Sequence, residues 1–415
     1  MSSKNILFIT LLRIESLDDR GIYHDLLRDL KNKGHKIFVV SPFERRYNLN
    51  TKLNITKQTQ VLNVKTLNIQ KTNLIEKTLS TLTIEYLFMN AIKKYYSNIK
   101  FDLIIYSTPP ITITKIISYI KKKNGAYSYL LLKDIFPQNA VDLKFIKKDS
   151  LIHKFFLRRE KKLYDLSDRI GCMSLANYNY IIKNNPSIDF KKLEINPNSI
   201  EPIDINILSH KKDFIRSKYS LPLNKKIFIY GGNLGKPQGL DFLLDSIKST
   251  VRLDVFYLII GSGTEYVRIQ KWFEFNQPKN AMLINNLPKL EYDKLLSVCD
   301  VGLIFLSPNF TIPNYPSRLL SYLEMKLPVI TATDIHTDIG KDIEEYIPKE
   351  CFIDRRSFVN HEQLYNFLKD MPEKQYINYQ KNIKNFIVNQ SEKFSCKKFA
   401  ETISFKIVET INENY

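Results

Sequence analysis

Glycines and a lysine cluster where a strand is expected to give way to a helix. Four of the chain's 12 glycines lie within the nine residues 231-GGNLGKPQG-239, after the apolar run KKIFIY. A strand, a glycine-rich turn and a following helix together present backbone amides to an anion, because glycine lets a ligand approach the backbone closely. Lys236 adds a positive charge. The stretch therefore indicates a phosphate site, or a tight turn that binds nothing.

The turn matches neither of the two common phosphate-binding fingerprints. Gly231, Gly235 and Lys236 fall one residue short of the GxxxxGK spacing, and Pro237 stands where a magnesium-binding Ser or Thr is needed. Tyr230 occupies the place of the first glycine of GxGxxG. A P-loop is excluded, and the dinucleotide fingerprint is incomplete.

Apolar runs alternate with helix-periodic segments along the whole chain. Several runs are continuously apolar, as strands buried on both faces of a parallel sheet are. The pattern predicts an α/β protein with two doubly wound, Rossmann-like halves. Strands are expected at 5–10, 35–41, 102–107, 126–132, 169–173 and 192–196, and then at 225–230, 255–260, 281–285, 301–305, 327–332 and 351–353.

The boundary between the halves falls near residues 197–222, a stretch rich in Pro, Asn and Ser with little periodicity. We expect an N-terminal domain over 1–200 and a C-terminal domain over 201–390, with a final helix over 391–415. Two such sheets that face each other place their strand ends at a central cleft, where ligands of doubly wound sheets bind. The 231–239 turn lies at such a strand end.

A second candidate ligand loop precedes the helix expected at 22–33. Ile22, Leu26, Leu27 and Leu30 share one face of that helix, which predicts that the face packs on the sheet. Asp19, Arg20 and Gly21 stand at its entrance. They are expected to meet a ligand from the first domain, unless the loop is plain surface.

Sixty-two Lys and Arg against 43 Asp and Glu give the 415-residue chain a formal charge of +19. This balance favours anionic partners, although a codon bias toward lysine gives the same composition. Four scattered cysteines without CxxC spacing fit a reducing compartment and argue against a zinc site. There is no signal-like N-terminus and no apolar run of membrane-spanning length, so we expect a cytoplasmic protein.

Two segments bear on membranes. Residues 144–162 carry eight Lys or Arg against two acids, interleaved with Phe and Leu. This pattern suits the anionic inner leaflet and a peripheral location, or a solvated helix with a core stripe. A second set of apolar residues at helical spacing is predicted to be core rather than a lipid-docking face; its members are Ile75, Leu79, Leu82, Tyr86 and Met89.

The phrase 315-YPSRLLSYLEMKLPVI-330 resembles the PS(K/R)LLEYxxxGxPVI signature of retaining GT-B glycosyltransferases of family GT4. The 231–239 turn resembles the first turn of that family's nucleotide-binding domain. The segments 130-LLLKDIFPQNAV-141, 160–186 and 195–201 resemble its N-terminal domain, in the right order. The resemblance is strongest to the capsule and O-antigen branch, which includes fucosamine-type transferases. It implies a GT-B fold whose C-terminal helix crosses back to the first domain.

The resemblance also implies roles for single residues. Lys236, Arg318 and Asp134 would serve catalysis, with Asp19, Arg20, Gly21 and Lys133 near the acceptor. The donor would be bound by Gly232, Asn233, Leu234, Gly235, Gly261, Gly263, Ser317, Leu319 and Glu324.

Two departures from the family pattern matter. Pro313 and Ser321 replace the Glu-x7-Glu pair of many relatives, so Glu324, near Ser321 on one helical face, is the expected substitute for the second Glu. Lys133 stands where many relatives have His before Asp134.

The implied reaction is the transfer of a sugar, such as an N-acetylated aminodeoxysugar, from a UDP-type donor to a polysaccharide or polyprenyl-diphosphate-linked acceptor. The leaving diphosphate gathers negative charge, which Lys236, Arg318 and the helix ends would stabilise. No Asp-x-Asp tripeptide occurs, so neither metal nor cofactor is expected. A nucleotide-sugar epimerase with the same architecture is the alternative. A nucleic-acid-binding protein is a weaker one, because no basic module with stacking aromatics is found, and no nucleic-acid partner is expected.

Overall fold

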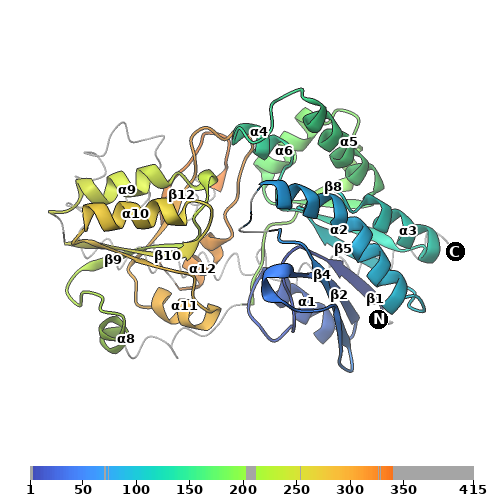
Figure 1. Cartoon of the computed structure of the whole chain (residues 1–415), viewed down its shortest axis with the longest axis horizontal. Coiled ribbons are helices and arrows are strands. Elements are labelled where there is room, and N and C mark those ends of the chain that lie inside the picture. The colour runs from blue at the N-terminus through green and yellow to red at the C-terminus, as the bar shows by residue number, and fades with distance from the viewer. Residues whose placement is uncertain are drawn as a thin grey trace. The chain divides into compact units, whose positions relative to one another are not determined.

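The computed structural model describes residues 3–69, 72, 74–201, 212–252, 254–325, 327 and 329–339 (Figure 1). The chain divides into two compact units, residues 1–201 with 392–415 and residues 202–391. The strand expected at 351–353 and the helix expected at 391–415 lie outside the described residues. The fold class is the predicted one, an α/β protein with two largely parallel sheets.

The described part of the first unit holds a sheet of order β3-β4-β2-β1-β5-β6-β7-β8. All neighbouring strands in it are parallel except the β3–β4 pair. β5 is buried throughout, and β1 is buried except for its first residue, Asn5, in agreement with their continuous apolar runs. The strands are β1 Asn5–Ile9, β2 Lys36–Glu44, β3 Lys52–Ile55, β4 Thr59–Thr66, β5 Leu103–Ser107, β6 Tyr127–Leu132, β7 Arg169–Cys172 and β8 Leu193–Ile195.

The hairpin of β3 and β4 was not predicted. In β3, Lys and Asn alternate with Leu and Ile, but β4 (TQVLNVKT) carries polar and apolar residues on both faces. Neither strand forms a clear apolar run. Asn63 of β4 is fully buried, and its side-chain amide donates to the Ile14 carbonyl at 2.6 Å and to Ser41 Oγ at 2.7 Å. A polar residue can occupy the core when it has partners, and these partners come from distant segments.

Helices cover both faces of this sheet. α1 (Ile22–Asn32) packs Leu26, Leu27 and Leu30 against the strands, as predicted. The crossovers from β4 to β5 and from β5 to β6 run in the opposite direction along the sheet, so right-handed connections place α2 and α3 on the other face. The helices on this part of the chain are α2 Leu74–Tyr95, α3 Thr114–Asn124, α4 Gln138–Asp142, α5 Leu151–Leu166 and α6 Leu175–Asn184, with short 3-10 turns at Arg45–Tyr47 (η1) and Phe190–Lys192 (η2).

The prediction that the apolar stripe on α2 is core was wrong for its three central members, and the side chain of Ile75 lies outside the described part of the chain. The helix turns Ile84, Phe88 and Ile92 toward the protein, all nearly inaccessible. On another face, Leu79, Leu82 and Tyr86 are 50%, 51% and 68% exposed. The sequence carries two apolar rows on one helix, and periodicity alone does not say which row meets the sheet.

The second unit contains a parallel sheet of order β11-β10-β9-β12-β13 within its described residues. Its strands are β9 Lys226–Asn233, β10 Val255–Ser262, β11 Ala281–Ile284, β12 Val301–Phe305 and β13 Val329–Ala332. The helical segments are α8 Lys212–Lys218, η3 Lys236–Gln238, α9 Leu240–Ser249, α10 Tyr266–Asn276, α11 Lys289–Leu296 and α12 Arg318–Glu324.

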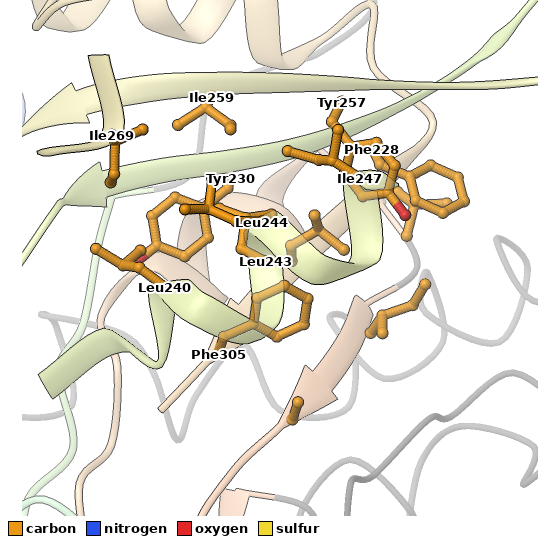
Figure 2. Packing of buried hydrophobic residues seen from close by; sticks show 14 of the residues in the cluster. Phe228, Tyr230, Leu240, Leu243, Leu244, Ile247, Tyr257, Ile259, Ile269 and Phe305 are labelled. Atoms are coloured by element: carbon orange, nitrogen blue, oxygen red, sulfur yellow. The ribbon is translucent and has the colours of Figure 1, made fainter. Parts of the chain in front are cut away.

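The core of this unit lies between α9 and the sheet (Figure 2). Leu240, Leu243, Leu244 and Ile247 form the buried face of α9, at the spacing expected for an amphipathic helix. They pack on side chains of β9, β10 and β12, among them Tyr230, Tyr257 and Phe305. This packing fixes α9, and so the turn that precedes it, against the carboxyl ends of the strands.

A buried arginine fixes the amino ends of the same strands. Arg216 of α8 is 2% exposed and donates to Asp300 Oδ2 at 2.6 Å and to the Val298 carbonyl at 2.8 Å. Asp300 Oδ2 also accepts the amide of Ile227 at 2.8 Å. The pair is buried but well supplied with hydrogen bonds, which is the condition for a tolerated buried ion pair.

Candidate functional site

The glycine turn of the second unit is built by close backbone packing. β9 runs on to Asn233, and Gly261 and Gly263, at and just beyond the end of β10, lie against it. A Cβ on Gly261 would lie 1.9 Å from the Gly232 oxygen, and one on Gly263 would lie 2.3 Å from the Leu234 oxygen. Any side chain would push the two strand ends apart. These two glycines therefore have a packing role, whether or not they also line a donor site.

Two tyrosines, Tyr292 and Tyr322, contact the turn at Gly231. A Cβ on Gly231 would lie 2.0 Å from Tyr292 Oη. Tyr322 Oη accepts the amide of Gly231 at 3.2 Å and lies 3.1 Å from the Leu303 carbonyl. Tyr322 belongs to α12, so this hydroxyl ties the helix of the YPSRLL phrase to β9 and β12. The turn and that phrase, about 80 residues apart in sequence, form one structure.

Arg318 lies directly against the turn. Its Cζ atom is 4.4 Å from the centre of the Tyr230 ring, and a Cβ on Gly232 would lie 3.9 Å from it. Nη2 donates to Gln238 Oε1, which also accepts from Tyr230 Oη at 3.2 Å. Nη1 is buried and makes no hydrogen bond to the described part of the chain. The Tyr230 ring and Gln238 thus orient the guanidinium through its flat face and through Nη2. Nη1 remains available to a ligand.

The electrostatic surroundings of Arg318 favour an anion. Burial raises the pKa of Tyr230, and the Arg318 charge opposes that rise. None of the ion pairs formed within residues 212–252, 254–325 and 329–339 involves Arg318. A desolvated guanidinium without a carboxylate neighbour can bind a phosphate through two parallel hydrogen bonds.

Not every amide of the turn is available to a ligand. The amide of Leu234 donates to the Ser262 carbonyl at 3.0 Å, and the Leu234 side chain is fully buried. The expectation that this residue donates its amide to a phosphate is therefore wrong. Gly232, Asn233 and Lys236 are exposed. The face that the turn presents to solvent is made by these three residues.

The phrase around Arg318 predicts a helix over 317–326, and α12 begins one residue later and ends two residues earlier. Ser317 is its exposed N-cap residue and makes no side-chain cap bond. Leu319 is 1% exposed and points into the core, so only its backbone could contact a donor. Glu324 is the last helical residue and is 7% exposed.

Asp334 and Asn314 are polar residues near this site that sequence reasoning did not single out. Asp334 follows β13 and is 1% exposed; its Oδ1 accepts the amides of His336 and Thr337 at 2.8 and 3.0 Å. Thr337 Oγ1 in turn donates to the Asn314 carbonyl, at 2.5 Å. Asp334 Oδ2 and Asn314 Nδ2 are buried and make no hydrogen bond within the described residues. An aspartate placed directly after an apolar strand was the available signal.

Asp134 lies at the end of β6 in the first unit. Its amide and that of Lys133 donate to Thr108 Oγ1, at 3.2 and 3.0 Å, which fixes the chain as it leaves the strand. Burial raises the pKa of Asp134 to about 6. The Asp134 charge also acts on Tyr23, whose pKa is raised mainly by burial. Lys133 lines a small pocket with Tyr23, Leu131, Asn196 and Asn198.

The loop that holds Asp19, Arg20 and Gly21 is shaped by an internal network. Asp25 of α1 is 1% exposed and accepts Arg28 Nη2 at 2.6 Å. Arg28 Nη1 donates to the carbonyls of Leu17 and Asp19, at 2.6 and 3.0 Å. Sequence reasoning missed Asp25 and Arg28, because charged residues on an amphipathic helix look solvated.

A histidine on the helix expected at 22–33 is predicted to lie on the surface, but His24 of α1 is buried and only 7% exposed. Within the described ranges, no group of three or more His, Cys, Asp or Glu has the arrangement of a metal site. In that same part of the chain, no helix is long and apolar enough to cross a membrane.

Comparisons with curated proteins give two distant relatives, and no family model matches the chain. The chain is 23% identical over 251 residues to the probable glycosyltransferase WbjE of Pseudomonas aeruginosa, covering 59% of this chain and 60% of WbjE. It is 26% identical over 137 residues to WcaI of Escherichia coli K12, named as a colanic acid biosynthesis glycosyl transferase, covering 32% of this chain and 33% of WcaI. The matches therefore span less than two thirds of each relative.

Solved structures match over nearly the whole chain. An E. coli trehalose-6-phosphate structure bound with UDP-2-fluoro glucose has a TM-score of 0.69 at 11% identity, covering 97% of this chain and 98% of its own. WaaG, a glycosyltransferase involved in lipopolysaccharide biosynthesis, gives 0.67 at 13% identity, with 96% and 99% covered. Anabaena HepE in complex with UDP and glucose gives 0.62 at 12% identity, with 98% and 100% covered. The chain shares with them the GT-B fold of two Rossmann-like domains.

Proposed function

We propose that this protein is a retaining glycosyltransferase. It would move a sugar, such as an N-acetylated aminodeoxysugar, from a UDP-linked donor to a lipid-linked or polysaccharide acceptor in bacterial surface glycan synthesis. The observation that carries the proposal is Arg318, stacked on Tyr230 beside the glycine turn with Nη1 unused. The names of the distant relatives and the GT-B fold support it.

On the donor side, Arg318 and Lys236 would bind the diphosphate. Negative charge develops on that group as the bond to the sugar breaks, and donors already oriented toward it stabilise the transition state without reorganisation. The contact of Arg318 with Gln238 and Tyr230 supplies that orientation. Gly232 and Asn233 are exposed and would form the wall of the diphosphate site together with the backbone of Gly235.

The rest of the donor would meet the loops after β10, β12 and β13. Glu324 would accept hydrogen bonds from the ribose hydroxyls in place of the missing Glu-x7-Glu carboxylate. Gly261, Gly263, Ser317 and Leu319 would contribute backbone contacts. Asp334 and Asn314, each with a buried polar atom that makes no hydrogen bond within the described residues, are suited to reading the sugar hydroxyls.

On the acceptor side, Asp134 would orient the attacking hydroxyl. Its carboxylate is desolvated, and the departing phosphate would take the hydroxyl proton on the same face of the sugar. Lys133 and the loop of Asp19, Arg20 and Gly21 would contact the acceptor glycan. The hydrogen bonds from the two amides to Thr108 hold Asp134 in place for this task.

We infer that no metal ion is needed, because Lys236 and Arg318 would neutralise the diphosphate charge in its place. Activity should then survive an excess of EDTA. Complete loss of transfer that magnesium or manganese restores would contradict this assignment.

A basic surface on the first unit would bring the enzyme to the inner face of the cell membrane. Phe145, between α4 and α5, is 51% exposed, and Leu151 and Ile152, at the start of α5, are 86% and 60% exposed. Lys147 and Lys148 are exposed beside them. Exposed apolar side chains flanked by lysines suit an anionic bilayer surface. The protein would thus be cytoplasmic and peripheral.

The test is a transfer assay with a panel of UDP-sugars and a polyprenyl-diphosphate-linked glycan, followed by mass spectrometry. We expect UDP to appear only when both substrates are present, together with an acceptor heavier by one sugar. Conversion of the UDP-sugar into an isomer without acceptor would instead show an epimerase. Tight binding to DNA without turnover would point to the nucleic-acid alternative.

A further inference from the structure

Three arginines of the first unit lie in the two segments that follow the carboxyl ends of β1 and β2, and two of them pack on one tyrosine. Arg13 lies in the loop after β1, and its Cζ atom is 4.2 Å from the centre of the Tyr47 ring. Arg46, next to Tyr47 in η1, lies 5.1 Å from the same ring. Arg45 precedes it, with a side chain that is 63% exposed. The Tyr47 ring packs on the Arg13 and Arg46 guanidiniums and limits their motion.

Each of these arginines pairs with one carboxylate, and two of the three carboxylates also accept a backbone amide. Glu44 pairs with Arg46 at 2.8 Å, but its other oxygen accepts the amide of Ile69 at 2.9 Å. Glu76 pairs with Arg45 at 3.0 Å and also accepts the amide of Asn68 at 3.2 Å. The third pair joins Arg13 to Glu15, which is 46% exposed, so an incoming anion can replace it in water.

The arginines continue directly into the exposed apolar row of α2. Glu76, the partner of Arg45, is in the first turn of that helix, and Leu79 lies three residues on. Leu79, Leu82 and Tyr86 share one face at spacings of three and four, and each is at least half exposed. A row of large exposed apolar side chains on a soluble domain marks a binding surface.

We propose that this arginine and α2 surface binds the lipid diphosphate of the acceptor. The diphosphate would lie on Arg13 and Arg45 beside Tyr47, and the hydrocarbon chain would follow Leu79, Leu82 and Tyr86. The inference rests on the proposed transferase function and specifies its acceptor as a lipid diphosphate rather than a free polysaccharide.

The arginines and the apolar row follow one another along the surface, as the head group and the tail do in a lipid diphosphate. Arginine forks match phosphate oxygens, and the apolar row begins one helical turn from their partner Glu76. A single molecule with an anionic head and a long apolar tail satisfies both parts. The surface is also at the same edge of the sheet as Asp134, because β1, β2 and β6 are parallel. The glycan that is attached to the diphosphate would extend along that edge.

Binding is the first test, because it needs no turnover. Micelles that carry polyprenyl diphosphate would be titrated with the full chain, with uncharged polyprenol as reference. We expect Arg13→Gln and Arg45→Gln each to weaken binding to the diphosphate roughly tenfold, as for one hydrogen bond to a charged group. Lys36→Gln, an exposed residue at the opposite end of β2, should change nothing. Equal binding by wild type and both arginine variants would overturn the proposal.

The apolar row has its own test. Leu79→Ser with Leu82→Ser should weaken binding of a long-chain diphosphate and leave a short-chain analogue unaffected. Ile55→Ser, 64% exposed on β3, is the matched control. If the same variants lose binding to anionic vesicles without any diphosphate lipid to the same extent, the surface is a general membrane contact, and the proposal fails.

Transfer assays separate this inference from the proposed function. If wild type binds the lipid diphosphate through the arginines but transfers no sugar, the transferase proposal fails and the binding site stands. If wild type transfers sugar and the arginine and leucine variants have unchanged KM for the lipid acceptor, the site fails alone. UDP affinity and melting temperature should stay at wild-type values in all variants, since none of these residues belongs to the second unit.

Discussion

The carboxyl edges of the two sheets are built on opposite plans. In the second unit, Tyr292 and Tyr322 pack against a turn built of glycines at the strand ends. Tyr230 and Gln238 orient one arginine that lacks a carboxylate partner among the described residues. In the first unit, longer loops are tied by buried carboxylates, and arginines and apolar side chains remain exposed. A preorganised edge suits a small constant group such as a nucleoside diphosphate, whereas exposed, adaptable side chains suit a bulky acceptor.

Arg318→Ala is expected to have the largest effect. It removes a hydrogen-bond donor to a group that gains charge in the transition state, so turnover should fall about 10²–10³-fold, roughly 2.7–4 kcal/mol, and more than donor affinity falls. Arg318→Lys should recover part of the rate, because a point charge cannot make the two-pronged contact. Rates, UDP affinity and melting temperature would be measured for both variants.

Gln238→Leu is the control for Arg318, because it removes the partner of Nη2 and leaves the charge in place. We expect a smaller loss of rate from this orienting contact. If Arg318→Ala transferred sugar at nearly the normal rate, or only unfolded the protein, the donor edge would not be the preorganised one.

Asp134→Asn should cost up to about 10² in acceptor kcat/KM and abolish its pH dependence. In the wild type, kcat/KM should rise as pH increases through about 6, because the Asp134 carboxylate must be ionised to accept a hydrogen bond from the acceptor hydroxyl. Initial rates across pH 5–8 at saturating donor would show this. A rise of the same midpoint in the Asn variant would assign the titration to another group.

Stability should move in the other direction for the same variant. The pKa of Asp134 is raised from 3.8 to about 6, so the folded state binds more protons than the unfolded state between these values. Stability therefore falls as pH rises across that window and stays lower above it. Asp134→Asn should melt higher than wild type at pH 7 and lose this slope. A lower melting temperature would indicate a structural role.

Gly261→Ala should damage the donor edge through packing. A Cβ there meets the backbone oxygen of Gly232, so we expect a loss of about 1–3 kcal/mol of unfolding free energy and weaker UDP binding. Gly235→Ala is the matched variant, because the nearest atom to its Cβ belongs to the exposed Asn233 side chain, at 3.0 Å, and not to the backbone. Denaturant unfolding of both would test the contrast, and equal losses would count against it.

Charge at the start of α5 should have the smallest effect. Lys148→Gln should reduce binding to anionic vesicles roughly fivefold, as for about 1 kcal/mol per lysine near the surface, and high salt should weaken the wild type as well. Arg159 is a poor choice for this test, because it packs on Phe155 at 5.3 Å and contacts Thr114. If neither high salt nor Lys148→Gln changed the affinity for anionic vesicles, the contact would not depend on charge and the prediction would fail.

Several features were predictable from the sequence, because they depend on short-range patterns. Continuous apolar runs predicted the strands from β9 to β13, and glycine density predicted the turn after β9. The phrase around Arg318 predicted a helix at 317–326, close to the observed α12. Period and composition act over a few residues, and these elements follow from them.

What the tertiary structure decided is which residues meet. Arg318 reaches Gln238 across 80 positions, and Asn63 is buried because Ile14 and Ser41 supply its partners. The exposed row on α2 and the buried row beside it have the same period, so only contact with the sheet distinguishes them. Local sequence fixes a residue's place on its own element, whereas burial and pairing depend on the elements that pack against it.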